Sequence, residues 1–361
     1  MADPRLPSVD RMLPPRENRR QWLARSLPAA ALPAGSLLAL SGCLRSADDE
    51  VVVYAALDRE FSGPLLDRFQ TETSVSVAPK YDVESTKTVG LVNALMLEKD
   101  RPRCDVFWNN EILHTLRLAR AGALEPYRSP EASHYPAAFR QADGLWYGFA
   151  ARARVLLVNR EQVANGERPA SIAALADPRW SGKAGLAKPL FGTTATHAAV
   201  LFAIWGEARA TAFFETVHRQ ARIMSGNKQV ATAVGRGQLA WGLTDTDDAI
   251  DEVESGAPVD IVFPDQSPDG MGTLLIPNTV AIIRRCPHPQ RARQLIDFLL
   301  RPAVERQLAA GASAQFPLHD AVTERPRVEP QPAPRWMEVD FEQAANRWDA
   351  AARFLKELFT S

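Results

Sequence analysis

Short apolar runs alternate with helical repeats along the chain from Val51 onward. Residues 51–55 are a continuous, mostly β-branched apolar run, which is typical of a parallel strand buried on both faces. Leu65 and Phe69 then recur at helical spacing, and the same succession of strand and helix follows twice more, up to Leu118. Strands that alternate with helices imply right-handed crossovers, so the pattern predicts an α/β fold with doubly wound sheets.

The same alternation resumes after residue 155 and predicts a second α/β unit. Residues 273–276 and 279–283 are expected to form two further strands, followed by helices over 289–300 and 303–309. This is too much chain for one sheet with short loops, so we expect two lobes joined by two hinge crossings. The expected divisions are 51–150 plus 275–322 for the first lobe, 155–270 for the second, and 323–361 for a proline-rich linker and an amphipathic C-terminal helix.

The first 43 residues differ in kind from the rest of the chain. Arg19 and Arg20 precede an apolar run of 15 residues, 26–40, which is shorter than the roughly 20 residues that a lasting transmembrane helix needs. The arginine pair resembles a twin-arginine export signal, and Leu-Ser-Gly-Cys at 40–43 resembles a bacterial lipobox. We therefore expect residues 1–43 to be a signal peptide and the mature lipoprotein to be anchored through Cys43, in a periplasmic or extracytoplasmic location.

Composition and charge exclude several classes of function. With 361 residues, 46% of them hydrophobic, the chain can build one large or two moderate cores. The formal net charge of −1 gives no electrostatic reason to expect a nucleic-acid partner. The histidines show no HExxH spacing, and neither a GxSxG elbow nor a Walker loop is present. We expect no enzyme and no resident cofactor; paired carboxylates leave a cleft hydrolase as the weakest alternative.

An acidic turn follows the apolar stretch that begins at Trp241. Asp245, Asp247 and Asp248 stand where a short strand runs into a helix. Two interpretations are open, because acids at such a corner either cap the helix and complement its dipole or contact a ligand at the carboxyl end of the strand.

Other strand ends and helix starts carry polar side chains as well. Asp58 and Arg59 follow the first strand, and Asn110 and Glu111 follow the third, so we expect both pairs at one sheet edge. Arg152 is either a ligand contact or a group in solvent or in a salt bridge, while the helix-start residues could simply be caps. The candidate ligand contacts are Asp58, Arg59, Asn110, Glu111, Arg152, Thr193, Thr194, Asn227, Asp245 and Asp247.

Several stretches resemble periplasmic ferric-iron-binding proteins of ABC transporters. They are VYAALDRE, CDVFWNNE, GLWYGFAARARVLLVN, LADPRWSG and NTVAII, in the family's order across about residues 50 to 320. The resemblance implies a two-lobed, type 2 periplasmic-binding-protein-like fold that closes around its cargo by a hinge motion. It also implies delivery to ABC permease subunits in the membrane, and we expect the chain to act as a monomer.

The resemblance also suggests which residues would hold a metal. In that family, a histidine or acid after the first strand, a glutamate after the DVF strand and two adjacent tyrosines hold the iron. The matching positions here are Asp58, Asn110 or Glu111, and the pair Asp247 and Asp248, which replaces both tyrosines. The chain therefore offers carboxylates where the family has phenolates.

The cargo follows from this mixture of acids and bases. The expected metal ligands, Asp58, Glu111, Asp247 and Asp248, together with Asp245, make an oxygen-only set suited to Fe(III) or another hard ion. Helix starts and arginines nearby would suit an anion such as carbonate, phosphate or an organic chelator. Fe(III), with or without such a companion, is the favoured transported ligand. The alternative is a zwitterionic or anionic solute such as an aminoalkyl phosphonate.

Overall fold

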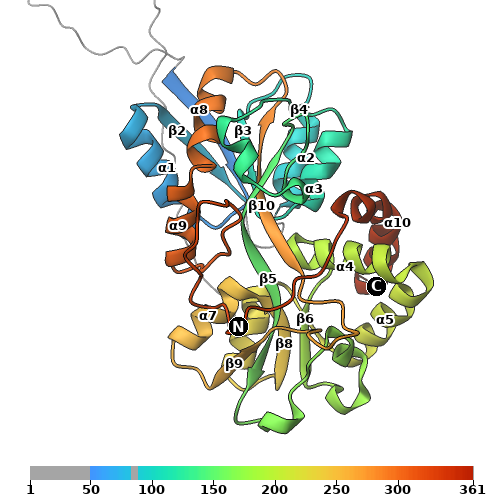
Figure 1. The fold of residues 1–361 in the computed structure, drawn as a ribbon. Coiled ribbons are helices and arrows are strands. Elements are labelled where there is room, and N and C mark those ends of the chain that lie inside the picture. Colours follow the sequence, from blue (N-terminus) through green and yellow to red (C-terminus); the bar gives the residue numbers. More distant parts are fainter. Residues whose placement is uncertain (1–48, 83–87, 361) are drawn as a thin grey trace, which may run out of the picture. The chain divides into compact units, whose positions relative to one another are not determined.

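The first apolar run forms strand β1 (Glu50–Ala55). The computed structural model describes residues 49–82 and 88–360 (Figure 1). The expected export signal and Cys43 lie outside the described residues. All the elements named below belong to one compact unit, 45–361.

One half of the sheet is built from the first strands. β1 pairs in parallel with β2 on one side and with β3 on the other, and every residue of β3 is buried. Burial on both faces explains why Val106, Phe107 and Trp108 of β3 are apolar without alternation. The elements are β2 (Ser76–Tyr81), β3 (Val106–Asn109), α1 (Arg59–Thr73), α2 (Val89–Leu97) and α3 (Leu113–Arg120).

Strand β5 (Tyr147–Asn159) joins the two halves of the sheet. Its first residues pair antiparallel with β10 (Leu275–Ile283), and residues 154–158 pair antiparallel with β8 (Trp241–Asp245). Figure 1 shows β5 and β10 running between β1 to β3 on one side and β6, β8 and β9 on the other. Short 3-10 helices flank β5, at Pro130–His134, Ala137–Phe139, Asn165–Glu167, Ile172–Ala176 and Pro178–Trp180.

The prediction of two strands between 273 and 283 was wrong, because β10 is continuous. Pro277 lacks the N–H that a sheet ladder uses, and the pairing with β5 shifts register between Pro277 and Asn278. The Asn278 Nδ2 group donates to Gln315 Oε1 at 2.8 Å and also to the carbonyl of Ala150. The register shift therefore accommodates Pro277, and the strand continues past it.

The other half of the sheet repeats the parallel pattern. β8 and β7 each pair in parallel with β6, and β9 pairs with β5. The strand order is β2-β1-β3-β10-β5-β8-β6-β7, with β4 beside β10. The elements are β4 (Leu124–Glu125), β6 (Ala184–Ala187), β7 (Arg222–Met224), β9 (Val259–Val262), α4 (Gly192–Trp205), α5 (Glu207–Gln220), α6 (Asn227–Gly235) and α7 (Thr246–Glu254).

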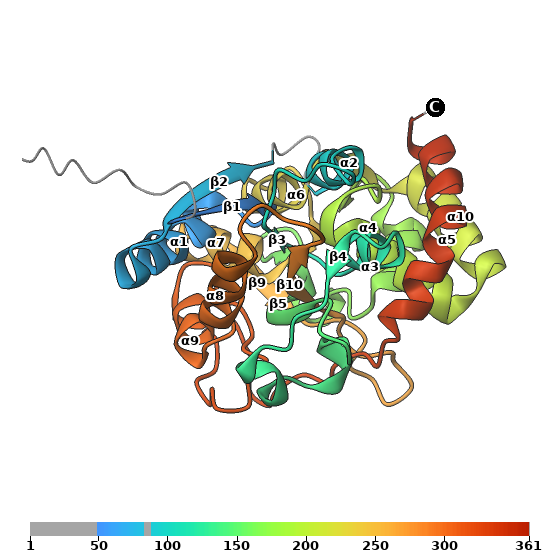
Figure 2. The ribbon, with the colours of Figure 1, turned by 90° about the horizontal axis from the view of Figure 1, so that it is seen from above.

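The C-terminal helices cover different parts of this sheet. α8 (Pro289–Leu299) packs on β10, β1 and β3, and α9 (Pro302–Ala310) packs on β5. The expected final helix is α10 (Phe341–Thr360), which packs against α4, α5 and α3 (Figure 2). Among the described residues, no helix combines the length and apolarity needed to cross a bilayer.

Candidate functional site

A cavity of about 350 Å3 lies at the ends of strands from both halves of the sheet. It collects residues that follow β1, β3, β6 and β8, together with Arg152 from β5. The structure thus brings together strand ends that are far apart in the sequence. This agrees with the rule that ligands bind at the carboxyl ends of the strands in α/β sheets, called the strand-end rule below. The candidate residues that line it are Asp58, Arg59, Asn110, Arg152, Thr193, Thr194, Asn227, Asp245, Asp247 and Asp248.

Arg152 is a buried cation in the wall of this cavity. Its Nη1 donates to Asp247 Oδ2 at 2.9 Å and lies 4.0 Å from Asp245 Oδ2, while Nη2 donates to the carbonyl of Asn110. Burial alone would lower the pKa of Arg152, but Asp247 and Asp245 hold that pKa above its usual value. The idea of a solvated strand end was wrong, and Arg152 is a permanent positive charge in an ion pair.

Asp245 accepts hydrogen bonds from several side chains, of which Thr193 and Asn227 also line the cavity. Arg154 donates to Oδ1 at 2.6 Å, and Thr193 and Asn227 donate to Oδ2 at 2.5 and 3.0 Å. Burial raises the pKa of Asp245, yet Arg154 and Arg152 outweigh it, so the pKa falls below its usual value. Asp245 occupies the N-cap position of α7 without a side-chain cap bond in the described structure. The helix-cap interpretation of its side chain was therefore wrong.

Helices α1, α4, α6 and α7 all begin at the cavity. Their N-cap residues are Asp58, Phe191, Gly226 and Asp245, and within the described chain none of these side chains caps its helix. First-turn N–H groups of a helix lack intrahelical partners and carry the positive end of its dipole. Several such ends therefore face one space, which is the arrangement that binds anions.

The helix-start residues, for which capping was the alternative to ligand contact, do not occupy the N-cap positions. Thr193 and Thr194 lie inside the first turn of α4, and Asn227 is the first residue of α6. The Thr194 hydroxyl donates to Asn227 Oδ1 at 2.9 Å, and Asn227 Nδ2 donates back to Thr193 Oγ1 at 2.9 Å. These hydrogen bonds tie the starts of α4 and α6 together around Asp245.

Sequence reasoning overlooked one lysine of the cavity lining. Lys188 directly follows β6, so the strand-end rule could have found it. Lys228 Nζ lies 3.9 Å from Glu60 Oε1 and 3.9 Å from Asp251 Oδ2, and all three residues line the cavity. Acidic and basic side chains thus both line the cavity.

Glu111 does not join these residues. It is fully buried outside the cavity lining, and it accepts from the Leu113 N–H at 2.5 Å, from His114 Nδ1 at 2.9 Å and from Thr196 Oγ1 at 2.6 Å. Burial opposes its ionisation, but His114 and the hydrogen bonds keep the pKa of Glu111 below its usual value. Because its oxygens hold the start of α3, Glu111 is not placed to bind cargo.

The carboxylates of the cavity could hold a hard cation. One oxygen each from Asp245, Asp247 and Asp248 lie within 4.8 Å of one another. Since Arg152 and Arg154 already neutralise two of these acids, a cation there would need additional negative ligands. The site therefore suits a ligand that carries both signs of charge, such as a metal with its anion or a zwitterion.

Comparison with known proteins gives a consistent result. A family model described as "Bacterial extracellular solute-binding protein" matches residues 114–343. The Fe(3+)-binding periplasmic protein of Serratia marcescens is 26% identical over 216 residues, which are 60% of this chain and 62% of that protein. Iron uptake protein A1 of Synechocystis is 26% identical over 302 residues, 78% of this chain and 82% of its own length.

Solved structures show the same fold. Iron-bound HitA from Pseudomonas aeruginosa superposes with a TM-score of 0.77 at 21% identity, covering 85% of this chain and 99% of that one. AfuA from Actinobacillus pleuropneumoniae, with exogenous fructose-6-phosphate bound, gives 0.75 at 20% identity over 86% and 98%. These likenesses confirm the two-lobed, type 2 periplasmic-binding fold. Because the family model spans more than half of the 361 residues, this chain belongs to the bacterial extracellular solute-binding protein family.

Proposed function

We propose that this chain is the extracytoplasmic receptor of an ABC importer and captures ferric iron together with an anion. The observation that carries the proposal is the meeting of Asp245, Asp247 and Asp248 with the uncapped starts of α4 and α6 in one cavity. The relatives from Serratia marcescens and Synechocystis, both named for iron, support the choice of cargo. Delivery to a membrane permease, action as a monomer and lipid anchoring through Cys43 complete the proposal.

The chemistry assigns separate parts of the cavity to the metal and to the anion. Fe(III) is a hard ion that prefers oxygen ligands, which Asp247 and Asp248 supply. No tyrosine belongs to the described lining, so the protein provides no phenolate and the anion must complete the coordination. Arg152, Lys188 and the helix starts would hold that anion by charge and by backbone N–H groups.

The cargo would also bring the two halves of the sheet together. Asp58 and Asn110 follow strands of one half, whereas Asp245 ends a strand of the other half and Asp247 follows it. A ligand that contacts both sets binds the closed form more tightly than the open form and shifts the population toward it. A permease can distinguish loaded from empty receptor by this difference.

A phosphate-bearing or zwitterionic solute is the second candidate. The helix starts, with Arg59, Lys188 and Lys228, favour a phosphoryl group even without metal. The fold shared with AfuA, whose structure contains fructose-6-phosphate, agrees with this candidate. In that case the aspartates would accept hydrogen bonds from hydroxyl or ammonium groups.

Native mass spectrometry of the tag-free chain would separate the two candidates. Ferric citrate, citrate alone, inorganic phosphate, fructose 6-phosphate and 2-aminoethylphosphonate are each offered at equal concentration. We expect one iron per chain, retained with its anion, and no retention of citrate alone. Retention of a phosphorylated solute or phosphonate without iron would establish the second candidate, and binding of none of them would contradict both.

A further inference from the structure

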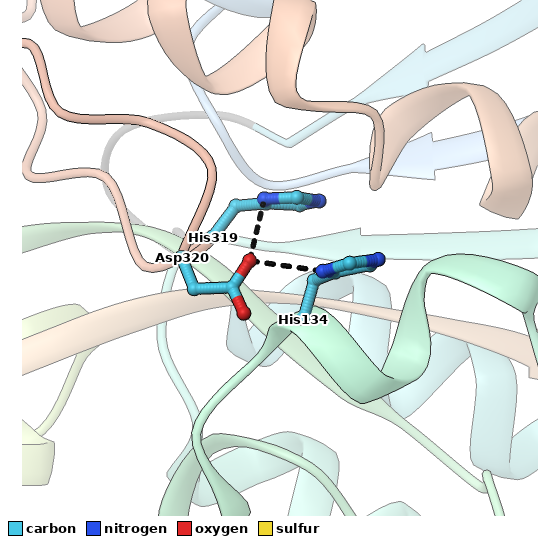
Figure 3. A group of neighbouring side chains, drawn as sticks. All are labelled: His134, His319 and Asp320. Carbon is cyan, nitrogen blue, oxygen red and sulfur yellow. Dashed lines mark hydrogen bonds and ion pairs between the residues drawn. The ribbon is translucent and has the colours of Figure 1, made fainter.

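A second group of side chains with metal-binding chemistry lies outside the cavity. His134 ends the 3-10 helix Pro130–His134, and His319 with Asp320 lies in the segment after α9 (Figure 3). His134 and Asp320 are 186 positions apart in the chain, so no sequence spacing reveals the group. None of its members lines the cavity at the strand ends.

The ring nitrogens of the two histidines face one carboxylate oxygen. Asp320 Oδ1 lies 2.9 Å from His134 Nδ1 and 3.6 Å from His319 Nδ1. The rings are stacked, with centroids 4.8 Å apart and planes 12° apart, and both Nδ1 atoms lie on the side of Asp320 (Figure 3). A tetrahedral ion with bonds of about 2.0 Å spaces its ligand atoms about 3.3 Å apart, between the two observed distances.

The surroundings hold one imidazole firmly and leave the other groups accessible. His319 is 3% exposed, Tyr135 packs edge-on against its ring, and its Nε2 lies 3.4 Å from Glu131 Oε2. A carboxylate on the distal nitrogen is the partner that orients metal-ligating histidines and raises their basicity. The side chains of His134 and Asp320 are 47% and 67% exposed, so they can adjust to an ion from solvent.

We propose that His134, His319 and Asp320 bind one divalent transition-metal ion of the Zn2+ type, with water completing its coordination. Two imidazoles and one carboxylate are a ligand set suited to Zn2+, Cu2+ or Ni2+, in contrast to the oxygen-only acids of the cavity. On binding, the ion takes the place of the proton on His134 Nδ1. At His319 Nδ1 it takes the place of the Ala321 N–H, which donates to that nitrogen at 3.1 Å in the metal-free chain. His134 tilts out of the stack so that its lone pair points at the ion.

Bound metal would link two segments beside strand β5. The Asp320 N–H already donates to the carbonyl of His134 at 3.0 Å, and Phe316 exchanges backbone hydrogen bonds of 2.7 and 2.8 Å with Ala151 of β5. The ion would add a further connection between the segment that carries His134 and the segment that carries His319 and Asp320. We therefore expect Zn2+ to raise the melting temperature of the chain.

Calorimetric titration of the tag-free chain with ZnCl2, in buffer free of chelators, tests this site. At pH 7.5 we expect one ion per chain, and at pH 5.5 a loss of at least tenfold in affinity, because protonated imidazoles cannot bind metal. His134→Ala and Asp320→Asn should each weaken binding at least tenfold. His218→Ala removes an exposed histidine elsewhere and should bind Zn2+ like the parent chain.

Two further measurements keep the result specific to this group. Asp248→Asn changes the cavity and should leave the Zn2+ affinity of this group unchanged. Co2+ bound in place of Zn2+ should show visible d–d absorption, and His134→Ala should abolish that absorption. Melting temperatures without metal establish that the variants fold. Failure of the parent chain to bind Zn2+ at pH 7.5, or equal binding by His134→Ala and Asp320→Asn, would overturn the proposal whatever the cargo of the cavity.

Discussion

The ion pair between Arg152 and Asp247 links the stability of the chain to its capture of cargo. Asp247→Asn removes the nearest carboxylate from the buried guanidinium, and the Asp245 carboxylate lies farther away, at 4.0 Å. Breaking a buried pair commonly costs about 3–5 kcal/mol, so we expect a lower free energy of unfolding as well as weaker binding of ferric citrate. The loss of affinity should be at least tenfold, about 1.4 kcal/mol. Urea denaturation and calorimetry measure the two effects.

Two other aspartates separate these effects. Asp248 lines the cavity and is only half-buried, so Asp248→Asn should weaken binding with a smaller loss of stability. Asp143 is exposed and lies outside the cavity lining, so Asp143→Asn should change neither. Unchanged affinity in Asp247→Asn would show that this acid only neutralises Arg152.

His197 predicts an acid sensitivity that arises inside α4. Burial, with a contribution from Arg154, lowers the pKa of His197 to about 3, and neither ring nitrogen has a hydrogen-bond partner among the described residues. Unfolded histidine binds a proton below about pH 6.5 while the folded form does not, so stability falls as the pH drops below 6.5. At pH 5 this effect costs about 2 kcal/mol.

His197→Leu should therefore stabilise the chain, and more so in acid. Removing an unsatisfied buried polar group should add about 1–3 kcal/mol at pH 7.5, and the gap to the parent chain should widen at pH 5. Denaturation at both pH values measures it, with His218→Leu as the exposed control. An equal gap at both pH values would mean that folded His197 can take up a proton.

Sequence patterns located the site but did not assign every role within it. Asp58 and Asp245 were found because polar residues at strand ends share one edge of a sheet. The same signal, an acid before a helix, could not distinguish Asp245 from Glu111. The Asp245 side chain accepts a hydrogen bond from Arg154, which lies 91 positions earlier in the chain. The Glu111 side chain instead accepts from the N–H of Leu113, the first residue of a helix that begins two residues later. Contacts so distant in the chain leave no local pattern.

At the scale of elements, α10 contacts helices that follow strands from both halves of the sheet. Toward α3, Arg120 Nη2 pairs with Glu342 Oε2 at 2.6 Å, and His114 packs on the ring of Trp348. Toward α4, Phe202 packs on Phe354 at 6.1 Å between ring centroids. The sequence pattern predicted an amphipathic helix at the C-terminal end of the chain, but the partners of its apolar face depend on the tertiary fold.

Trp348→Ala tests whether α10 joins these helices. Truncating a buried tryptophan leaves a cavity, so we expect a loss of about 3–5 kcal/mol in the free energy of unfolding. Hydrogen exchange should show faster exchange in both α3 and α4. Lys356→Ala, on an exposed position of α10, should leave exchange unchanged. Faster exchange in α10 alone would show that the helix covers its neighbours without bracing them.

At the scale of the whole molecule, we expect an ion pair between helices to influence how readily the cavity opens. Lys228 on α6 lies 3.9 Å from Glu60 on α1, and their side chains are 62% and 59% exposed. Such exposed pairs contribute about 0–1 kcal/mol and are weakened by salt, so this pair can shift the open and closed populations by at most about fivefold. A cargo that bridges both halves should shift them much further.

Small-angle X-ray scattering can compare these contributions directly. Ferric citrate should reduce the radius of gyration of the parent chain, and Lys228→Met should increase it without cargo while leaving the loaded value unchanged. The control Lys356→Met should match the parent in both states, since Lys356 lies on α10 and outside the cavity lining. Added salt should reproduce the effect of Lys228→Met on the empty parent chain and have little effect on that variant. A radius that stays constant on cargo binding would contradict closure of the two halves, even if the cargo binds at the expected site.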